Sequence, residues 1–123
     1  MVSFSGCAAP LKWPAEVNKY VLVWEKTYSR INTSPIALTP IADPEIAGYC
    51  YGDGHIELDL EYWNTDTTDE MKLALVFHEL GHCQLGYSHS AGISGYDGCP
   101  WTFMYPYVMS TRCWKLRYPD ITL

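Results

Sequence analysis

The sequence lacks several features that would place it in common protein classes. No apolar run approaches 18 residues, so no membrane span is predicted. Only 8 Lys and Arg stand against 14 Asp and Glu, which gives a net charge of −6, and the basic residues form no cluster. Nucleic acid is therefore not expected as a partner. No internal repeat or low-complexity tract occurs either, which excludes a repeat architecture.

What the sequence does contain argues against disorder. Hydrophobic residues make up 48% of the 123 positions and aromatic residues 15%, which is too much apolar surface for a chain without a buried core. A length of 123 residues is also typical of one domain. We therefore expect residues 1–123 to form a single globular domain, with a monomer as the favoured state.

The five cysteines include no C-x-x-C pair, which argues against a structural zinc finger. An odd number leaves at least one thiol unpaired in a monomer. Cys99 and Cys113 flank a short segment and could form a disulfide, and so could Cys50 and Cys83. Alternatively, these cysteines are reduced and buried as small apolar side chains. The sequence leaves the pairing open.

The N-terminal residues carry one further candidate feature. Phe4-Ser5-Gly6-Cys7 resembles the end of a lipoprotein signal. On that interpretation the true start lies upstream and Cys7 carries lipid, which favours a secreted or cell-envelope protein. The alternative is an ordinary chain terminus.

Apolar spacing and turn residues predict one helix and three short strands in the N-terminal half. The helix covers 14–29, with proline at its first position and apolar side chains on one face. Strands are predicted at 36–38, 46–51 and 55–59. The last two, joined by a Gly-Asp-Gly turn at 52–54, are expected to form an antiparallel hairpin.

The strand after this turn alternates apolar and acidic residues, which predicts one solvated face. The side chains expected on that face are Glu57, Asp59 and Glu61. His55, beside the turn, has no partner at metal-ligand spacing and is expected to be exposed.

A second helix is predicted over 68–85, and it is apolar around most of its circumference, which is typical of a buried helix. Thr67-x-x-Glu70 fits a capping box at its start, and Gly86 is suited to end it in a left-handed conformation. Little regular structure is expected beyond it until a short helix at 110–116. These elements indicate a compact α+β domain.

The buried helix carries the motif H-E-x-x-H at His78-Glu79-Leu80-Gly81-His82. Residues i and i+4 lie on one face of a helix, so two imidazoles at this spacing can bind the same Zn²⁺ ion. Glu79, next to the first histidine, can act on a zinc-bound water as general base without binding the metal. Histidines and a glutamate would be costly in a buried helix without such partners.

A catalytic zinc ion usually has a third protein ligand and an open fourth position. Glu79 is the last glutamate of the chain, so a glutamate further along cannot be that ligand. His89, seven residues after His82, is the best candidate. The remaining downstream candidates are Asp97, Asp120, Cys83, Cys99 and Cys113.

The segment from His78 to His89 resembles the zinc signature of metzincin metallopeptidases, H-E-x-x-H-x-x-G-x-x-H, most nearly in its matrixin-like form. The resemblance implies His78, His82 and His89 as zinc ligands and Glu79 as general base. Because Thr102-Phe-Met104-Tyr-Pro106 resembles the methionine turn of that family, it also implies Met104 as the floor beneath the metal. The chain departs from the pattern by one extra residue before Gly86.

The resemblance covers roughly residues 46–109 and extends to small metallopeptidases predicted in bacteria and phages. It implies a minimal metzincin-like domain with an irregular C-terminal part. In metzincins an edge strand pairs with extended substrate, and the strand at 55–59 is expected to do so here. Tyr105 and Tyr107 are candidates for stabilising an oxyanion or lining a cleft, and Met109 competes with Met104 for the methionine position.

These observations predict a zinc metallopeptidase that acts on peptide or protein substrates, with Glu79 as the catalytic residue. Three alternatives remain open at this point, and one of them is an interaction protein that binds no metal. A zinc-binding domain without catalysis would use the same ligands, and a deformylase-like amidase would need an upstream cysteine ligand, for which the segment around Cys50 is a poor match.

Overall fold

A computed structural model describes residues 12–31 and 35–123. Cys7 and the signal-like residues before it lie outside the described part of the chain. The elements, in order, are α1 (Ala15–Thr27), β1 (Ile36–Thr39), β2 (Gly48–Cys50), β3 (Ile56–Asp59), α2 (Leu60–Asn64), α3 (Asp69–Leu85) and α4 (Thr111–Arg117). Helices combined with one small sheet confirm the expected α+β class.

The three strands form one mixed sheet in the order β1-β3-β2. Strand β2 pairs antiparallel with β3, so the expected hairpin is present, although its first strand is shorter than predicted. Strand β1 pairs parallel with the other side of β3. The prediction that 55–59 is an edge strand is therefore wrong, because both sides of β3 are occupied. The edge strands are β1 and β2, and β2 is the one that contacts α3.

The helix α2 was not predicted, because the alternating apolar pattern of β3 runs past the end of the strand. Asp59 ends the strand and caps the helix, since its carboxylate accepts hydrogen bonds from Tyr62 N at 3.2 Å and Ile41 N at 2.9 Å. Leu60 and Glu61 are therefore helical, and the predicted solvated strand face stops at Asp59.

Helix α3 begins one residue later than the predicted capping box requires. The cap is Thr68, whose hydroxyl accepts a hydrogen bond from Met71 N at 3.2 Å. Thr67 instead donates its hydroxyl to the carbonyl of Tyr62, so the Thr67–Glu70 capping box is not formed. At the other end Gly86 has φ 68° and ψ 22°, which confirms the left-handed termination.

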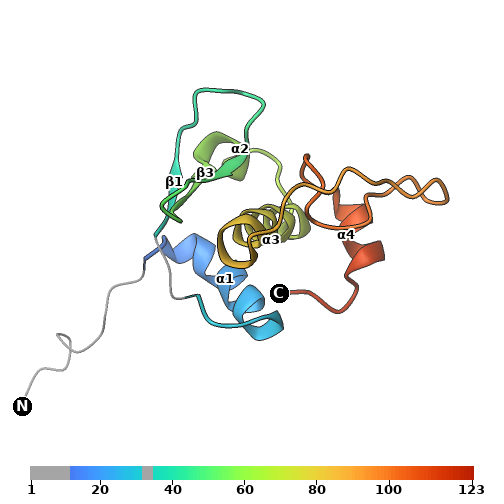
Figure 1. Cartoon of the computed structure of the whole chain (residues 1–123). Helices are drawn as coiled ribbons and strands as arrows, with labels where there is room; N and C mark the ends of the chain where they lie inside the picture. Colours follow the sequence, from blue (N-terminus) through green and yellow to red (C-terminus); the bar gives the residue numbers. More distant parts are fainter. Residues whose placement is uncertain (1–11, 32–34) are drawn as a thin grey trace, which may run out of the picture.

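Helix α3 lies at the centre of the fold and contacts β2, α1 and α4 (Figure 1). Its residues 73–81 are all buried, and Phe77 at their middle has no exposed surface. Phe77 packs edge-on against Trp24 of α1, with ring centroids 5.0 Å apart, and against Trp114 of α4 at 5.4 Å. Aromatic side chains therefore join the three longest helices into one core. No helix in the described ranges combines the length and the apolar character needed to cross a membrane.

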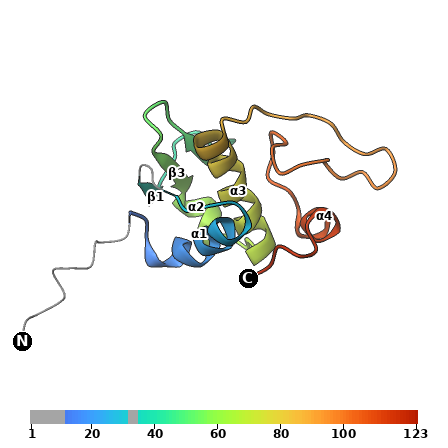
Figure 2. The same cartoon turned by 60° about the horizontal axis from the view of Figure 1, so that its bottom comes forward.

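The segment between α3 and α4 has no helix or strand, as predicted, and it extends away from the helices before returning to them (Figures 1 and 2). A disulfide joins Cys99 in this segment to Cys113 on α4, and another joins Cys50 on β2 to Cys83 on α3. Both candidate pairs are thus formed, and the alternative of reduced, buried thiols is wrong for these four cysteines.

Candidate metal centre

Three histidines come together at the C-terminal half of α3. His78 and His82 lie one helical turn apart, and His89 follows the left-handed turn at Gly86. The ring centroids are 4.7 to 5.1 Å apart, and one ligand nitrogen from each ring lies within 4.8 Å of the others. Within the described part of the chain, this is the one group of three or more His, Cys, Asp or Glu side chains close enough to hold a metal ion.

Backbone carbonyls orient the first two imidazoles. Nδ1 of His78 lies 2.8 Å from the carbonyl oxygen of Phe103, and Nδ1 of His82 lies 2.6 Å from that of Tyr87. A carbonyl can only accept, so both Nδ1 atoms carry the hydrogen and the Nε2 atom of each neutral ring presents a lone pair. Burial also lowers the pKa of His78 to about 4, which keeps this imidazole neutral at pH 7.

The two lone pairs face each other across 3.2 Å, between the Nε2 atoms of His78 and His82. Two nitrogen lone pairs at that distance repel each other unless a proton or a metal ion lies between them. Zinc–nitrogen bonds of about 2.0–2.1 Å at a tetrahedral angle place two ligand nitrogens roughly 3.3 Å apart. The three histidines could therefore hold a metal ion, with a carbonyl behind each of these two imidazoles as is usual for metal-ligating histidines.

The extra residue before Gly86 does not prevent His89 from joining the group. Helix α3 continues through Leu85, and the N–H of Tyr87 bonds back to the carbonyl of Gly81 at 3.0 Å. After His89, the N–H of Ser90 bonds to the carbonyl of Met104 at 2.9 Å. These two backbone bonds hold the short loop on both sides of the histidine.

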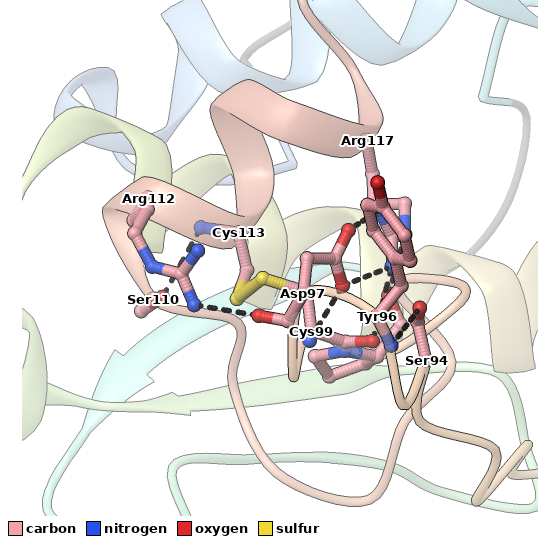
Figure 3. The surroundings of a disulfide bond; sticks show 9 residues. Ser94, Tyr96, Asp97, Cys99, Ser110, Arg112, Cys113 and Arg117 are labelled. Atoms are coloured by element: carbon pink, nitrogen blue, oxygen red, sulfur yellow. Dashed lines mark hydrogen bonds and ion pairs between the residues drawn. A yellow bond between two sulfur atoms is a disulfide. The ribbon is translucent and has the colours of Figure 1, made fainter.

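The competing third ligands are engaged elsewhere. Asp97 forms a bidentate ion pair with Arg117, at 2.7 and 2.9 Å, beside the Cys99–Cys113 disulfide (Figure 3). Cys83, Cys99 and Cys113 are all in disulfides, so none offers a thiolate. Asp120 is not part of the histidine group.

Glu79 lies beside the histidines as a buried carboxylate. Only 4% of its surface is exposed, and this burial raises the pKa of its carboxyl to about 8. It faces a cleft of about 760 Å³ that also borders His78, His82 and His89. A carboxylate that can hold or release a proton near neutral pH thus shares one cleft with the candidate ligands.

Met104 is buried and packs against α3. A side-chain Cβ at Gly81 would lie against the sulfur of Met104, so a larger residue at this position would displace the Met104 side chain. The neighbouring Phe103 supplies the carbonyl that orients His78. Met109, the competing methionine, is buried in the core.

The cleft is bounded by β2 and the loop before it on one side and by α3 on the other. Tyr107 lines it and is 71% exposed, whereas Tyr105 is not among the lining residues, although its ring lies 6.0 Å from that of Tyr107. His55 stacks on Tyr51 at 4.3 Å, is hydrogen-bonded to Asp53 and does not join the metal group.

Several lining residues were not singled out from the sequence as parts of a site, among them Gly48 and Tyr62. Tyr62 is half-buried on α2, and burial raises the pKa of its phenol. Gly48 is on β2, and its position beside Glu79 depends on how the sheet packs against α3. No short-range pattern in the sequence carries that information.

Comparisons with models of known protein families, with curated proteins and with solved structures found no match.

Proposed function

We propose that the protein is a zinc-dependent metallopeptidase of a reduced, metzincin-like kind. The observation that carries the proposal is the grouping of three histidine nitrogens with a buried, acidic side chain in one open cleft. His78, His82 and His89 would hold the metal, which leaves a fourth position for substrate or water. Met104 would form the floor beneath it.

A bound zinc ion would polarise the scissile carbonyl and make water nucleophilic near neutral pH. Glu79 would accept a proton from the attacking water at a carboxylate oxygen and return it to the leaving amine. Phe103 and Tyr87 would hold the imidazoles of His78 and His82 in the tautomer that presents Nε2.

The free edge of β2 supports a peptide as the substrate. Asp59 N bonds to Ala47 O and Tyr51 N bonds to His55 O, so these bonded residues direct their polar groups toward β3. Because hydrogen-bonding direction alternates along an antiparallel strand, Gly48 directs its N–H and C=O toward the free edge. An extended peptide could pair there, which assigns to β2 the role predicted for 55–59. Tyr107 would line the bound peptide.

Two features of the molecule bear on the two alternatives that bind zinc. A deformylase-like amidase would need a cysteine ligand, and Cys50, the candidate for that ligand, is bonded to Cys83. A zinc-binding domain without catalysis would share the histidines but has no use for a buried carboxylate facing an open cleft. We therefore favour the peptidase, with the binding domain as the result to be tested against.

Two disulfides in a chain of this length also support an extracytoplasmic location. Disulfides persist in oxidising compartments and are rare where thiol buffers keep cysteines reduced. We propose that the protein is secreted or held in the cell envelope, in line with the signal-like sequence before Cys7.

The test combines metal analysis with turnover of a peptide library. Glu79→Gln should keep one zinc per chain and lose turnover by roughly 10²–10⁴-fold. His89→Ala should lose metal affinity, whereas Glu61→Gln, an exposed matched substitution, should change neither property. Bound zinc with no turnover of any peptide would indicate the non-catalytic domain, and absence of bound zinc in the wild type would end the proposal.

A further inference from the structure

The carboxylate of Glu79 is positioned in an unusual way. Glu79 is only 4% exposed, and burial alone shifts the pKa of its carboxyl. Yet no residue in 12–31 or 35–123 holds the carboxylate by a hydrogen bond or an ion pair. Most buried carboxylates are oriented by donors. The orientation of Glu79 must therefore come from the atoms packed around it.

Gly48 on β2 packs against Glu79 from another element of the fold. A Cβ at Gly48 would lie 3.0 Å from Oε2 of Glu79 and 3.1 Å from its Cγ. It would also lie 3.1 Å from Cδ1 of Leu75, one turn earlier on the same face of α3. Ordinary contacts between carbon atoms are about 3.5–4.0 Å, so a Cβ at Gly48 would require the Glu79 or Leu75 side chain to shift by a few tenths of an ångström.

Strand β2 cannot easily move back to make room for a larger residue. It is hydrogen-bonded to β3, and the disulfide from Cys50, two residues after Gly48, ties it to Cys83 on α3. Leu75 is itself 2% exposed and enclosed in the core. The carboxylate, which borders the cleft, is thus the group that would move.

We propose that Gly48 is a positioning residue for Glu79, because the missing side chain at this point of the strand sets where the carboxylate lies. This inference rests on the proposed function for its effect on turnover, but the contact itself does not. The backbone of Gly48 is not in the left-handed region, so the substitution Gly48→Ala introduces a Cβ without conformational strain.

The first measurement is kinetic. Gly48→Ala should lower kcat about tenfold, since displacing a catalytic group by less than 1 Å is costly, and should change KM and zinc affinity less than twofold. Gly52→Ala is the matched control, because it lies just after β2, its Cβ would meet nothing within 4 Å and its φ is not positive. An unchanged kcat in Gly48→Ala would overturn the inference.

The second measurement needs no metal and no activity. In the metal-free protein, Gly48→Ala should lower Tm more when Glu79 is present than in the Glu79→Ala background, where only the close contact with Leu75 remains. Gly52→Ala should shift Tm equally in both backgrounds. Equal shifts in Tm from Gly48→Ala in both backgrounds would overturn the inference, even if kcat fell. The fall in kcat would then be due to the new methyl group in the cleft and not to displacement of Glu79. A wild type without turnover would contradict the proposed function and leave this test intact.

Discussion

Helix α3 and the irregular segment 87–110 build the candidate metal centre by different physical means. The helix is held by burial, since all residues in 73–81 are buried. The segment has no helix or strand and only one isolated bridge, between Ile93 and Pro100. It is held instead by cross-links, which are the Cys99–Cys113 disulfide and the ion pair in which Asp97 accepts two bonds from Arg117 (Figure 3).

Each region supplies what the other cannot. The helix places His78, His82 and Glu79 at a spacing that its own geometry determines. The segment supplies His89 and, through Tyr87 and Phe103, the carbonyls that orient the two helical imidazoles. Irregular backbone is suited to this task, because its carbonyls are not used in helix bonds. Residues 87–110 can therefore supply His89 and the two orienting carbonyls without regular secondary structure, because a disulfide and an ion pair hold the segment in place.

The largest expected effect tests the burial that holds the helix. Phe77→Ala removes a fully buried ring that contacts Trp24, Phe103 and Trp114. We expect the free energy of unfolding to fall by about 3–5 kcal/mol, measured by urea denaturation. A loss below 1 kcal/mol would mean that the core around α3 is not the main source of stability. Leu22→Ala, at a position that is 53% exposed on α1, is the control and should have little effect.

The next effect tests the cross-link that holds the segment. The double variant Cys99→Ser/Cys113→Ser opens a loop with a sequence separation of 14 residues, and we expect it to cost about 3 kcal/mol in urea unfolding. Zinc affinity should fall as well, because the loop carrying His89 and the Phe103 carbonyl loses an anchor.

The matched variant Cys50→Ser/Cys83→Ser should weaken zinc binding less, because α3 itself holds His78 and His82. If this pair proves more damaging to zinc affinity than the first, then the strand β2, and not the irregular segment, supports the metal centre. Both variants are measured with the same competitive chelator titration.

The ion pair in the segment makes a pH-dependent contribution. Hydrogen bonds from Arg117 and from Cys99 N hold the pKa of Asp97 at about 2, below its ordinary 3.8. Because the pKa of Asp97 is lower in the folded state, the ion pair stabilises the fold at any pH above the ordinary pKa of the carboxyl. This contribution is lost as the pH falls from about 4 through 2. Asp97→Asn should therefore lower Tm at pH 6 and flatten the dependence of Tm on pH over that range. An unchanged profile would show that the pair does not stabilise the segment.

The smallest effect concerns the start of α3. Thr68→Ala removes the cap on Met71 N and the contact with the hydroxyl of Thr111, 2.6 Å away at the start of α4, and should cost about 1 kcal/mol. Glu70→Ala should cost only a few tenths of a kcal/mol, because the capping box is not formed and only the helix dipole is affected. Equal effects in urea unfolding would favour the capping box after all.

Much of the helical half could be predicted because local patterns specify helices. The apolar face of α1, the buried character of α3 and the left-handed end at Gly86 all depend on residues within a few positions of one another. The errors lie where local patterns compete. Two threonines side by side can both cap α3, and Asp59 can continue a strand or begin α2. Contacts outside the local window decided both cases.

The sheet shows the same limit more clearly. Its strands were found in roughly the right places, but the position of β3 in the centre required knowing that β1 pairs with it in parallel. Parallel pairing joins segments that are far apart in the chain and leaves no turn signal in the sequence. The free edge was therefore assigned to the wrong strand.

The sequence by itself determined the pair His78 and His82 and the place of Glu79 beside them, because the spacing of side chains along a helix follows from the helix alone. The tertiary structure decided which of several downstream residues joins that pair, which carbonyls orient the rings and which strand borders the cleft. It also placed Gly48 against Glu79. These features depend on contacts between distant parts of the chain, which form only when burial of the core and the two disulfides bring those parts together.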